Sequence, residues 1–193
     1  MIRSKTDYMF FLEADRLALG MNRIKPRLFI DAIWRFQRLL RKVEYYTNCK
    51  KKLLYQPIRL LYKYLLYRRR LLLGFTIPIN VFDSGLSIAH IGTIVVNGNA
   101  RTGKNCRIHI CTNIGNGAST SDTPILGDNI YIGPGAKIFG NIEIADNIAI
   151  GANAVVNKSF LTPGVTIGGI PARVISQKGS YGLLRKNGYK NES

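Results

Sequence analysis

Acidic residues, cysteines and histidines are scarce in this chain. Of its 193 residues, 11 are Asp or Glu, 3 are Cys and 2 are His, whereas 28 are Lys or Arg. An odd number of cysteines without CxxC spacing argues against a disulfide framework or a zinc site, so we expect reduced thiols in a cytoplasmic protein. Two histidines are too few for a metal site built on three imidazoles. We therefore expect no metal.

Long apolar runs are missing as well. No stretch of 18 apolar residues occurs, which argues against a membrane-spanning helix. The start, MIRSKTDYMFFLEADR, contains no uninterrupted apolar segment, so we do not expect a secretory signal. Hydrophobic residues nevertheless make up 46% of the chain. This is enough to bury a core in one main domain with an appendage.

The positive charge is concentrated in the first third of the chain. Residues 1–74 contain 18 Lys or Arg against 5 Asp or Glu, whereas residues 75–193 contain 10 against 6. We expect any anionic partner to meet this basic region. The cations could face solvent in a helical bundle, or they could meet an anionic membrane or a diphosphate-linked lipid sugar. Nucleic acid is the least favoured partner, because no binding module is visible and charge alone carries no sequence specificity.

Residues 1–74 have helical periodicity. Apolar residues recur at spacings of three and four from Ile33 to Val43 and again from Ile58 to Leu73, with a break at residues 47–52. Residues 5–18 are a candidate for a further short helix. The stripe expected to be buried on the last helix comprises Ile58, Leu61, Tyr62, Leu65, Leu66 and Leu73.

After Gly74 the period changes to six. The aliphatic residues at this spacing are Val96, Ile108, Ile114, Leu126, Ile132, Ile138, Ile144, Ile150 and Val156, with Thr102 as a departure. Glycine often follows them by one position, and small residues often follow by four. Such a repeat predicts a solenoid of stacked coils in which each short strand places one aliphatic residue inward. Gly or Asn would form the corners, where positive φ is needed.

The repeat segment IGPGAKIFGNIEIADNIAIGANAVV and the following GGIPARVI resemble the hexapeptide-repeat acyltransferases, and AHIGTIVV is similar to their serine acetyltransferase branch. The resemblance covers about residues 75–176. It implies a left-handed parallel β-helix, a homotrimer, and acetyl-CoA bound in the groove between neighbouring β-helices. We therefore expect a basic α-helical region at 1–74, the acyltransferase domain at 75–176 and a tail at 177–193.

In this family a histidine acts as general base, and the resemblance matches it to His90. Imidazole titrates near neutral pH and can take the proton of an acceptor hydroxyl. A structural role and, less favoured, metal ligation remain alternatives. His109 is expected above His90 on the adjacent coil, near a corner, with either a site role or a structural one. Asp83 is the nearest upstream acid, and it is a candidate to orient His90 or simply a turn residue.

The resemblance also indicates where acetyl-CoA would lie. Small side chains would let the pantetheine arm lie against the coil, and cations would bind its phosphates; each cation alone is better explained as a solvated surface charge, and the set together favours the binding role. The residues expected to bind acetyl-CoA are Gly115, Asn116, Ala136, Ala152, Lys158, Arg173 and Lys178. The polar segment 116–124 is expected to project as a loop.

Departures from the serine acetyltransferase pattern bear on the acceptor. Ala89 replaces the acidic residue beside the histidine, Phe75 falls near the position of the family's orienting Asp, and residues 121–125 contain no histidine. The chain therefore looks more like the serine-acetyltransferase-like O-acetyltransferases of bacterial surface-polysaccharide clusters, and we expect transfer to a sugar hydroxyl. O-acetylation of serine for cysteine biosynthesis is the second interpretation. A non-enzymatic β-helix scaffold, with helices that bind partners or membrane, is the third. The expected location is the cytoplasm or the inner face of the membrane.

Overall fold

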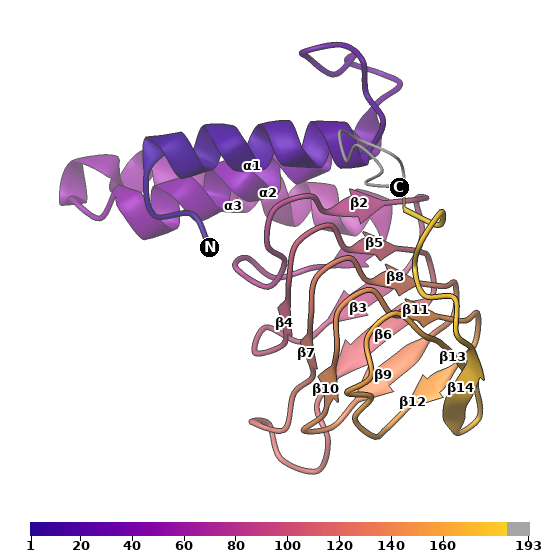
Figure 1. Ribbon diagram of the computed structural model, residues 1–193. Coiled ribbons are helices and arrows are strands. Elements are labelled where there is room, and N and C mark those ends of the chain that lie inside the picture. Colours follow the sequence, from indigo (N-terminus) through magenta and orange to yellow (C-terminus); the bar gives the residue numbers. More distant parts are fainter. Residues whose placement is uncertain (185–193) are drawn as a thin grey trace.

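A computed structural model describes residues 1–184 of the chain, in which a helical region lies across one end of a stack of coils (Figure 1). The helices are α1 (Lys5–Ala18), α2 (Ala32–Cys49), a short 3-10 helix (Leu53–Tyr55) and α3 (Gln56–Leu73). The Ser4 hydroxyl caps α1 by accepting the Asp7 N–H at 3.0 Å. Gly74 ends α3 at a φ of 74°, a conformation that glycine adopts without strain. All three expected helices are therefore present.

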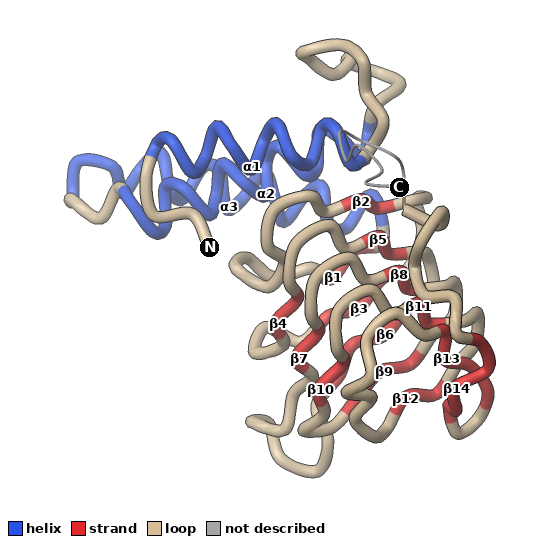
Figure 2. The backbone as a smooth tube through the Cα atoms, viewed as in Figure 1, coloured by secondary structure: helices blue, strands red, loops and turns tan. Residues whose placement is uncertain are grey.

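The strands form three sheets, which are the three sides of the coils (Figure 2). The first sheet contains β1 (Phe75–Thr76), β3 (Ile94–Val96), β6 (Thr112–Gly115), β9 (Lys137–Phe139) and β12 (Val155–Val156). The second contains β4 (Arg101–Thr102), β7 (Ile125–Leu126) and β10 (Glu143–Ile144). The third contains β2 (Ser87–Ile88), β5 (Arg107–Ile108), β8 (Tyr131–Ile132), β11 (Ala149–Ile150), β13 (Thr166–Gly169) and β14 (Ala172–Ser176). Every neighbouring pair is parallel except β13 and β14, so the coils form a parallel β-helix.

The six-residue repeat is the core of this β-helix. All nine aliphatic repeat positions are at most 2% exposed, and Thr102 is 4% exposed at the same inward position. Each fully buried side chain of this size contributes about 1.5–3 kcal/mol relative to an exposed one. The coil that leads from Ile114 to its partner Ile138 is longer by one repeat than the coil from Ile138 to its partner Val156. The extra length belongs to the expected loop 116–124, which projects from the coils (Figure 2).

The repeat glycines do not occupy the left-handed corners, where several asparagines lie together with Gly85, Gly135 and Cys111. Asn105, Asn129 and Asn147 have φ of 57°, 57° and 59°. Their side chains form a ladder in which each Nδ2 donates to the Oδ1 of the next, at 2.9 and 3.0 Å. The repeat glycine at 133 is needed for a different reason: a Cβ there would lie 2.8 Å from the backbone nitrogen of Ala152. Glycine is therefore required at position 133 because the neighbouring coil is too close for a side chain, and not because the backbone has a positive φ.

Buried polar groups join the helical region to the first coil. The fully buried Arg41 pairs with Asp15 at 2.8 Å and with Glu44 at 3.0 Å, and it donates to the carbonyls of Phe82 and Asp83. Burial by itself would lower the pKa of Arg41, but the two carboxylates together raise it. Asp15 Oδ1 also accepts the backbone N–H groups of residues 85 and 86. Helices α1 and α2 thus hold the segment that leads into β2.

The prediction for the buried stripe of α3 is only partly right. Leu66 and Leu73 are buried, but Leu61 is 52% and Leu65 is 39% exposed. The physical reason is that α3 packs against α2 and β1, which cover one narrow side of it. Within residues 1–184, no helix has the length and apolar character needed to cross a membrane. Residues 185–193 of the expected tail lie outside the described residues.

Candidate active site

Three aromatic side chains lie on successive coils beside the third sheet. His90 follows β2 and His109 follows β5, and these strands pair in parallel with Ile88 opposite Ile108. The ring centroids of His90 and His109 are 5.8 Å apart, which confirms that the two histidines lie above one another. Tyr131 on β8 continues the column, with its ring centroid 5.2 Å from that of His109. We call these three residues the histidine column.

The two histidines have different surroundings. His90 is exposed, and its ring contact with His109 is its one recorded side-chain interaction among residues 1–184. His109 is half-buried, and its Nε2 is buried with no hydrogen-bond partner in the described part of the chain. Burial lowers the pKa of His109 below its ordinary value, and Arg107 and His90 lower it further. His109 is therefore neutral at neutral pH. The ring of His90, in contrast to the half-buried His109, is exposed and accessible to substrate.

The lowered pKa of His109 predicts how stability depends on pH. Since protonation of His109 favours the unfolded chain, its neutral form stabilises the fold above about pH 6.5, and this contribution is lost as the pH falls through the folded-state pKa. We expect the stability advantage of the wild type over His109→Gln to shrink between about pH 7.5 and about pH 5.5. Urea unfolding at both pH values measures it, with His90→Gln as the exposed control. An advantage that stays constant with pH would contradict the assignment.

Asp83 and Phe75 are not placed to orient His90. One carboxylate oxygen of Asp83 accepts the Ser84 N–H at 2.6 Å, and the other lies 3.4 Å from the amino group of Met1. Asp83 thus behaves as a turn residue, and the structure does not bring it to His90. Phe75 is 2% exposed and packs edge-to-face against Phe36 at 5.1 Å. Phe75, which falls near the position of the family's orienting Asp, is therefore a core residue in this chain.

An open groove runs along the outer side of the first sheet. It has a volume of about 510 Å³. Two residues expected to bind acetyl-CoA, Gly115 and Asn116, line it. Lys137 also lines the groove, and its ammonium group donates to the carbonyl of Cys111 at 2.5 Å. Sequence reasoning missed Lys137, although its place one residue before the inward Ile138 marks it as outward-facing.

The other residues expected to bind acetyl-CoA are spread over the last coils. In the first sheet Gly115 pairs with Phe139, and Val156 pairs with Ile138. Lys158, two residues after Val156, therefore lies near the same end of this sheet as Gly115. Ala152, Arg173 and Lys178 are exposed at the turn after β11, on β14 and beyond β14 respectively.

Ala136 corrects one expectation. It is 0% exposed and belongs to the core, so its side chain cannot line an outer groove. The reason is its place in the repeat: the fourth residue after each inward aliphatic turns back into the coil, as Ala154 also does at 0% exposure.

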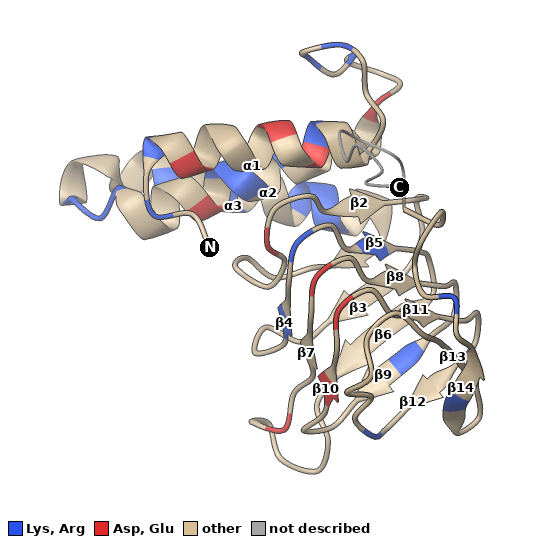
Figure 3. Ribbon diagram, viewed as in Figure 1, with Lys and Arg blue, Asp and Glu red and all other residues tan. Residues whose placement is uncertain are grey.

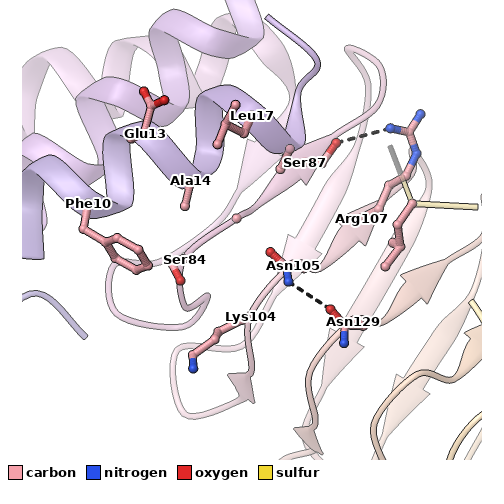
Figure 4. Close-up of a pocket in the computed structure, with 13 residues that line it drawn as sticks. Phe10, Glu13, Ala14, Leu17, Ser84, Ser87, Lys104, Asn105, Arg107 and Asn129 are labelled. Atoms are coloured by element: carbon pink, nitrogen blue, oxygen red, sulfur yellow. Dashed lines mark hydrogen bonds between the residues drawn. The ribbon is translucent and has the colours of Figure 1, made fainter. Parts of the chain in front are cut away.

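Within the described residues, no cysteine, metal-ligand cluster or cavity is a better candidate for the active site than the histidine column. Burial raises the pKa of the Cys106 thiol, which is 1% exposed, so Cys106 is unsuited to be a nucleophile. No three His, Cys, Asp or Glu side chains gather within residues 1–184 to hold a metal. A cavity of about 250 Å³ between α1 and the coil corners is lined by Phe10, Lys104 and Asn129 among others (Figure 4). Neither histidine lines it.

Comparisons with known proteins point to one group of enzymes. The sequence matches no family profile. Serine acetyltransferase of Synechococcus elongatus (strain ATCC 33912 / PCC 7942 / FACHB-805) is 36% identical over 113 residues, which are 57% of this chain and 46% of that protein. The crystal structure of serine acetyltransferase from Brucella abortus strain S19 matches with a TM-score of 0.71 at 26% identity, over 91% of this chain and 72% of that one.

A second structure of the Brucella abortus strain S19 serine acetyltransferase, in complex with coenzyme A, matches with a TM-score of 0.69 at 25% identity, over 91% of this chain and 70% of that one. The chain spans about half the length of the curated relatives it matches. In sequence and in structure it is therefore similar to the serine acetyltransferases, and it has the left-handed parallel β-helix, preceded by a helical region, of these hexapeptide-repeat proteins.

Proposed function

We propose that this chain is an acetyl-CoA-dependent O-acetyltransferase in which His90 is the general base. The observation that carries the proposal is the exposed imidazole of His90, whose ring centroid lies 5.8 Å from that of His109, in a fold similar to that of serine acetyltransferases. His90 takes the proton of the acceptor hydroxyl as the oxygen attacks the thioester carbonyl. The new C–O bond forms, the C–S bond breaks, and the leaving thiolate receives the proton.

The neutral His109 favours this role for His90. A protonated His109 would place a positive charge 5.8 Å from the ring of His90. Burial, which lowers the pKa of His109, removes that charge at neutral pH. His109 and Tyr131 then form an uncharged aromatic wall beside the base, against which the acceptor can lie.

Acetyl-CoA is the proposed acyl donor, and the groove on the first sheet is its proposed binding site. Gly115 and Asn116 leave room for an extended ligand, and Lys137 adds a cation to the groove. Lys158, Arg173 and Lys178 are exposed near the last coils and are the proposed partners of the phosphates. The same proposal includes a homotrimer, in which a neighbouring β-helix forms the other wall of the groove.

Serine is the acceptor that the comparisons favour, since the relatives found in sequence and structure are serine acetyltransferases. This reverses the order expected from the sequence. A sugar hydroxyl remains the second candidate, on one observation. The carboxylate that orients the histidine in those enzymes is replaced by the buried Phe75, and Asp83 does not take its place.

The acceptor is tested by acetyl-CoA turnover, followed as released thiol, with serine or a panel of sugars. We expect turnover with serine. Product analysis by mass spectrometry must show one added acetyl group on the acceptor. Turnover with a sugar alone would move the acceptor to the second candidate. Failure with every acceptor, lipid-linked sugars included, would favour a β-helix scaffold without the chemistry.

A further inference from the structure

The solvent-facing side of α3 is apolar and cationic. It consists of Leu60, Leu61, Lys63, Tyr64, Tyr67, Arg68, Leu71 and Leu72, here called the α3 face. Its leucines and tyrosines are 52–72% exposed. Just before α3, Leu53 and Leu54 are 84% and 82% exposed and follow three consecutive lysines. Such a concentration of large exposed apolar side chains marks an interaction surface.

The periodicity of α3 shows that this side is a continuous surface. Leu60, Tyr64, Tyr67 and Leu71 follow one another at spacings of four, three and four, so they form one stripe along the helix. The buried Leu66 and Leu73 lie on the opposite side, against α2 and β1. A broad apolar stripe on a helix is normally covered by another element. No element within residues 1–184 covers the α3 face.

Charge shows what kind of surface can cover it. Between Glu44 and Asp83 there is no acidic residue but there are eight Lys or Arg (Figure 3). Four of the five acidic residues before Asp83 are already paired with arginines: Asp15 and Glu44 with Arg41, Asp31 with Arg23, and Glu13 with Arg16. The cations on and near the α3 face therefore have no acidic counterpart within the helical region.

A second copy of the same face is a poor partner for it. Packing two α3 faces together would bring Lys63 and Arg68 of one copy near those of the other, with no carboxylate on either helix to compensate. Like charges in such contact weaken association. An anionic surface with an apolar interior offers both the charge and the apolar contact that this face lacks.

We propose that the α3 face binds the surface of an anionic lipid bilayer. The leucine and tyrosine side chains enter the boundary between headgroups and acyl chains, and Lys63, Arg68 and Lys50–Lys52 meet the lipid phosphates. Helix α3 lies in the plane of the membrane and does not span it. The β-helix, which follows from Phe75, then carries out its chemistry beside the bilayer.

The test is flotation of the full-length protein with mixed vesicles of phosphatidylcholine and phosphatidylglycerol, compared with vesicles of pure phosphatidylcholine. Each cation near an anionic surface contributes about a five-fold increase in binding. We expect Lys63→Glu/Arg68→Glu to weaken binding to the anionic vesicles by about 25-fold or more, and Leu71→Ser/Leu72→Ser to weaken it as well. The matched control is Arg101→Glu/Lys104→Glu, the same charge change on the exposed surface of the β-helix.

The proposal is overturned by any of three results. These are equal binding to both vesicle types, equal losses in the α3 and control variants, and no flotation. In the last case, protection of α3 from hydrogen exchange in an oligomer would identify a second copy as the cover. Acetyl transfer to a soluble acceptor should be unchanged in both leucine and charge variants, so failure of the membrane proposal is distinguishable from failure of the proposed function.

Discussion

Replacement of His90 by alanine is expected to lower the turnover number for acetyl transfer by about 10²–10⁴-fold, the usual contribution of a general base. This corresponds to about 3–5 kcal/mol of transition-state stabilisation. The imidazole is exposed and has no recorded contact except His109 among residues 1–184. Its removal should therefore leave the fold and coenzyme A binding unchanged. Stopped assays with saturating acetyl-CoA measure the effect on turnover directly.

Three controls make the His90 result specific. Light scattering must show the same oligomeric state for wild type and variant, urea unfolding must show the same stability, and calorimetry must show the same affinity for coenzyme A. Glu143→Gln, an exposed substitution on the second sheet, should retain full turnover. If His90→Ala keeps turnover within about threefold of the wild type, His90 is not the base.

The second large effect is expected at Arg41. Its replacement by methionine leaves the buried carboxylates of Asp15 and Glu44 without their cation, and breaking a buried pair in this way costs about 3–5 kcal/mol of unfolding free energy. Arg41 also donates to the carbonyls of Phe82 and Asp83. Its loss should therefore loosen the segment that leads into β2 and His90. Urea unfolding measures the loss of stability.

A matched substitution and a double variant separate charge pairing from helix packing. Arg38→Met lies on the same helix at a half-buried position, and Arg38 forms no ion pair within residues 1–184. This substitution should change stability by no more than about 0.5 kcal/mol. Arg41→Met/Glu44→Gln should cost less than the sum of the two single changes, because the double variant leaves one fewer unpaired carboxylate. A cost below about 1 kcal/mol for Arg41→Met would show that the ion pairs of Arg41 with Asp15 and Glu44 do not hold the helical region to the first coil.

Local patterns were sufficient for the architecture. The six-residue repeat predicted the inward residues of the β-helix, from Val96 to Val156, because each coil buries one aliphatic residue per side. Helical spacing predicted α2 and α3 and the break between them, and residues 5–18 were a candidate for the further helix that the structure shows as α1. The spacing of His90 and His109, close to one coil, predicted that they lie above one another on adjacent coils.

Local patterns did not predict which residues pair with one another on neighbouring coils. Tyr131 joins the histidine column because the coil between Arg107 and its partner Tyr131 is longer by one repeat than the coil from Tyr131 to its partner Ala149. No local signal shows where an inserted loop restores the register. Ala136 was misplaced for a related reason: small residues suit both a ligand groove and the inside of a coil corner, and only burial distinguishes the two.

The sequence by itself determined the β-helix, its acyltransferase-like motifs, the concentration of cations in residues 1–74 and the candidate base. These depend on residue type and short spacing, which a linear chain carries. Only the tertiary structure decided that Asp83 turns away from His90, that burial makes His109 neutral and that α3 leaves an apolar, cationic face uncovered. Each of these depends on which residues distant in sequence come into contact, and on how much solvent the packed helices and coils exclude.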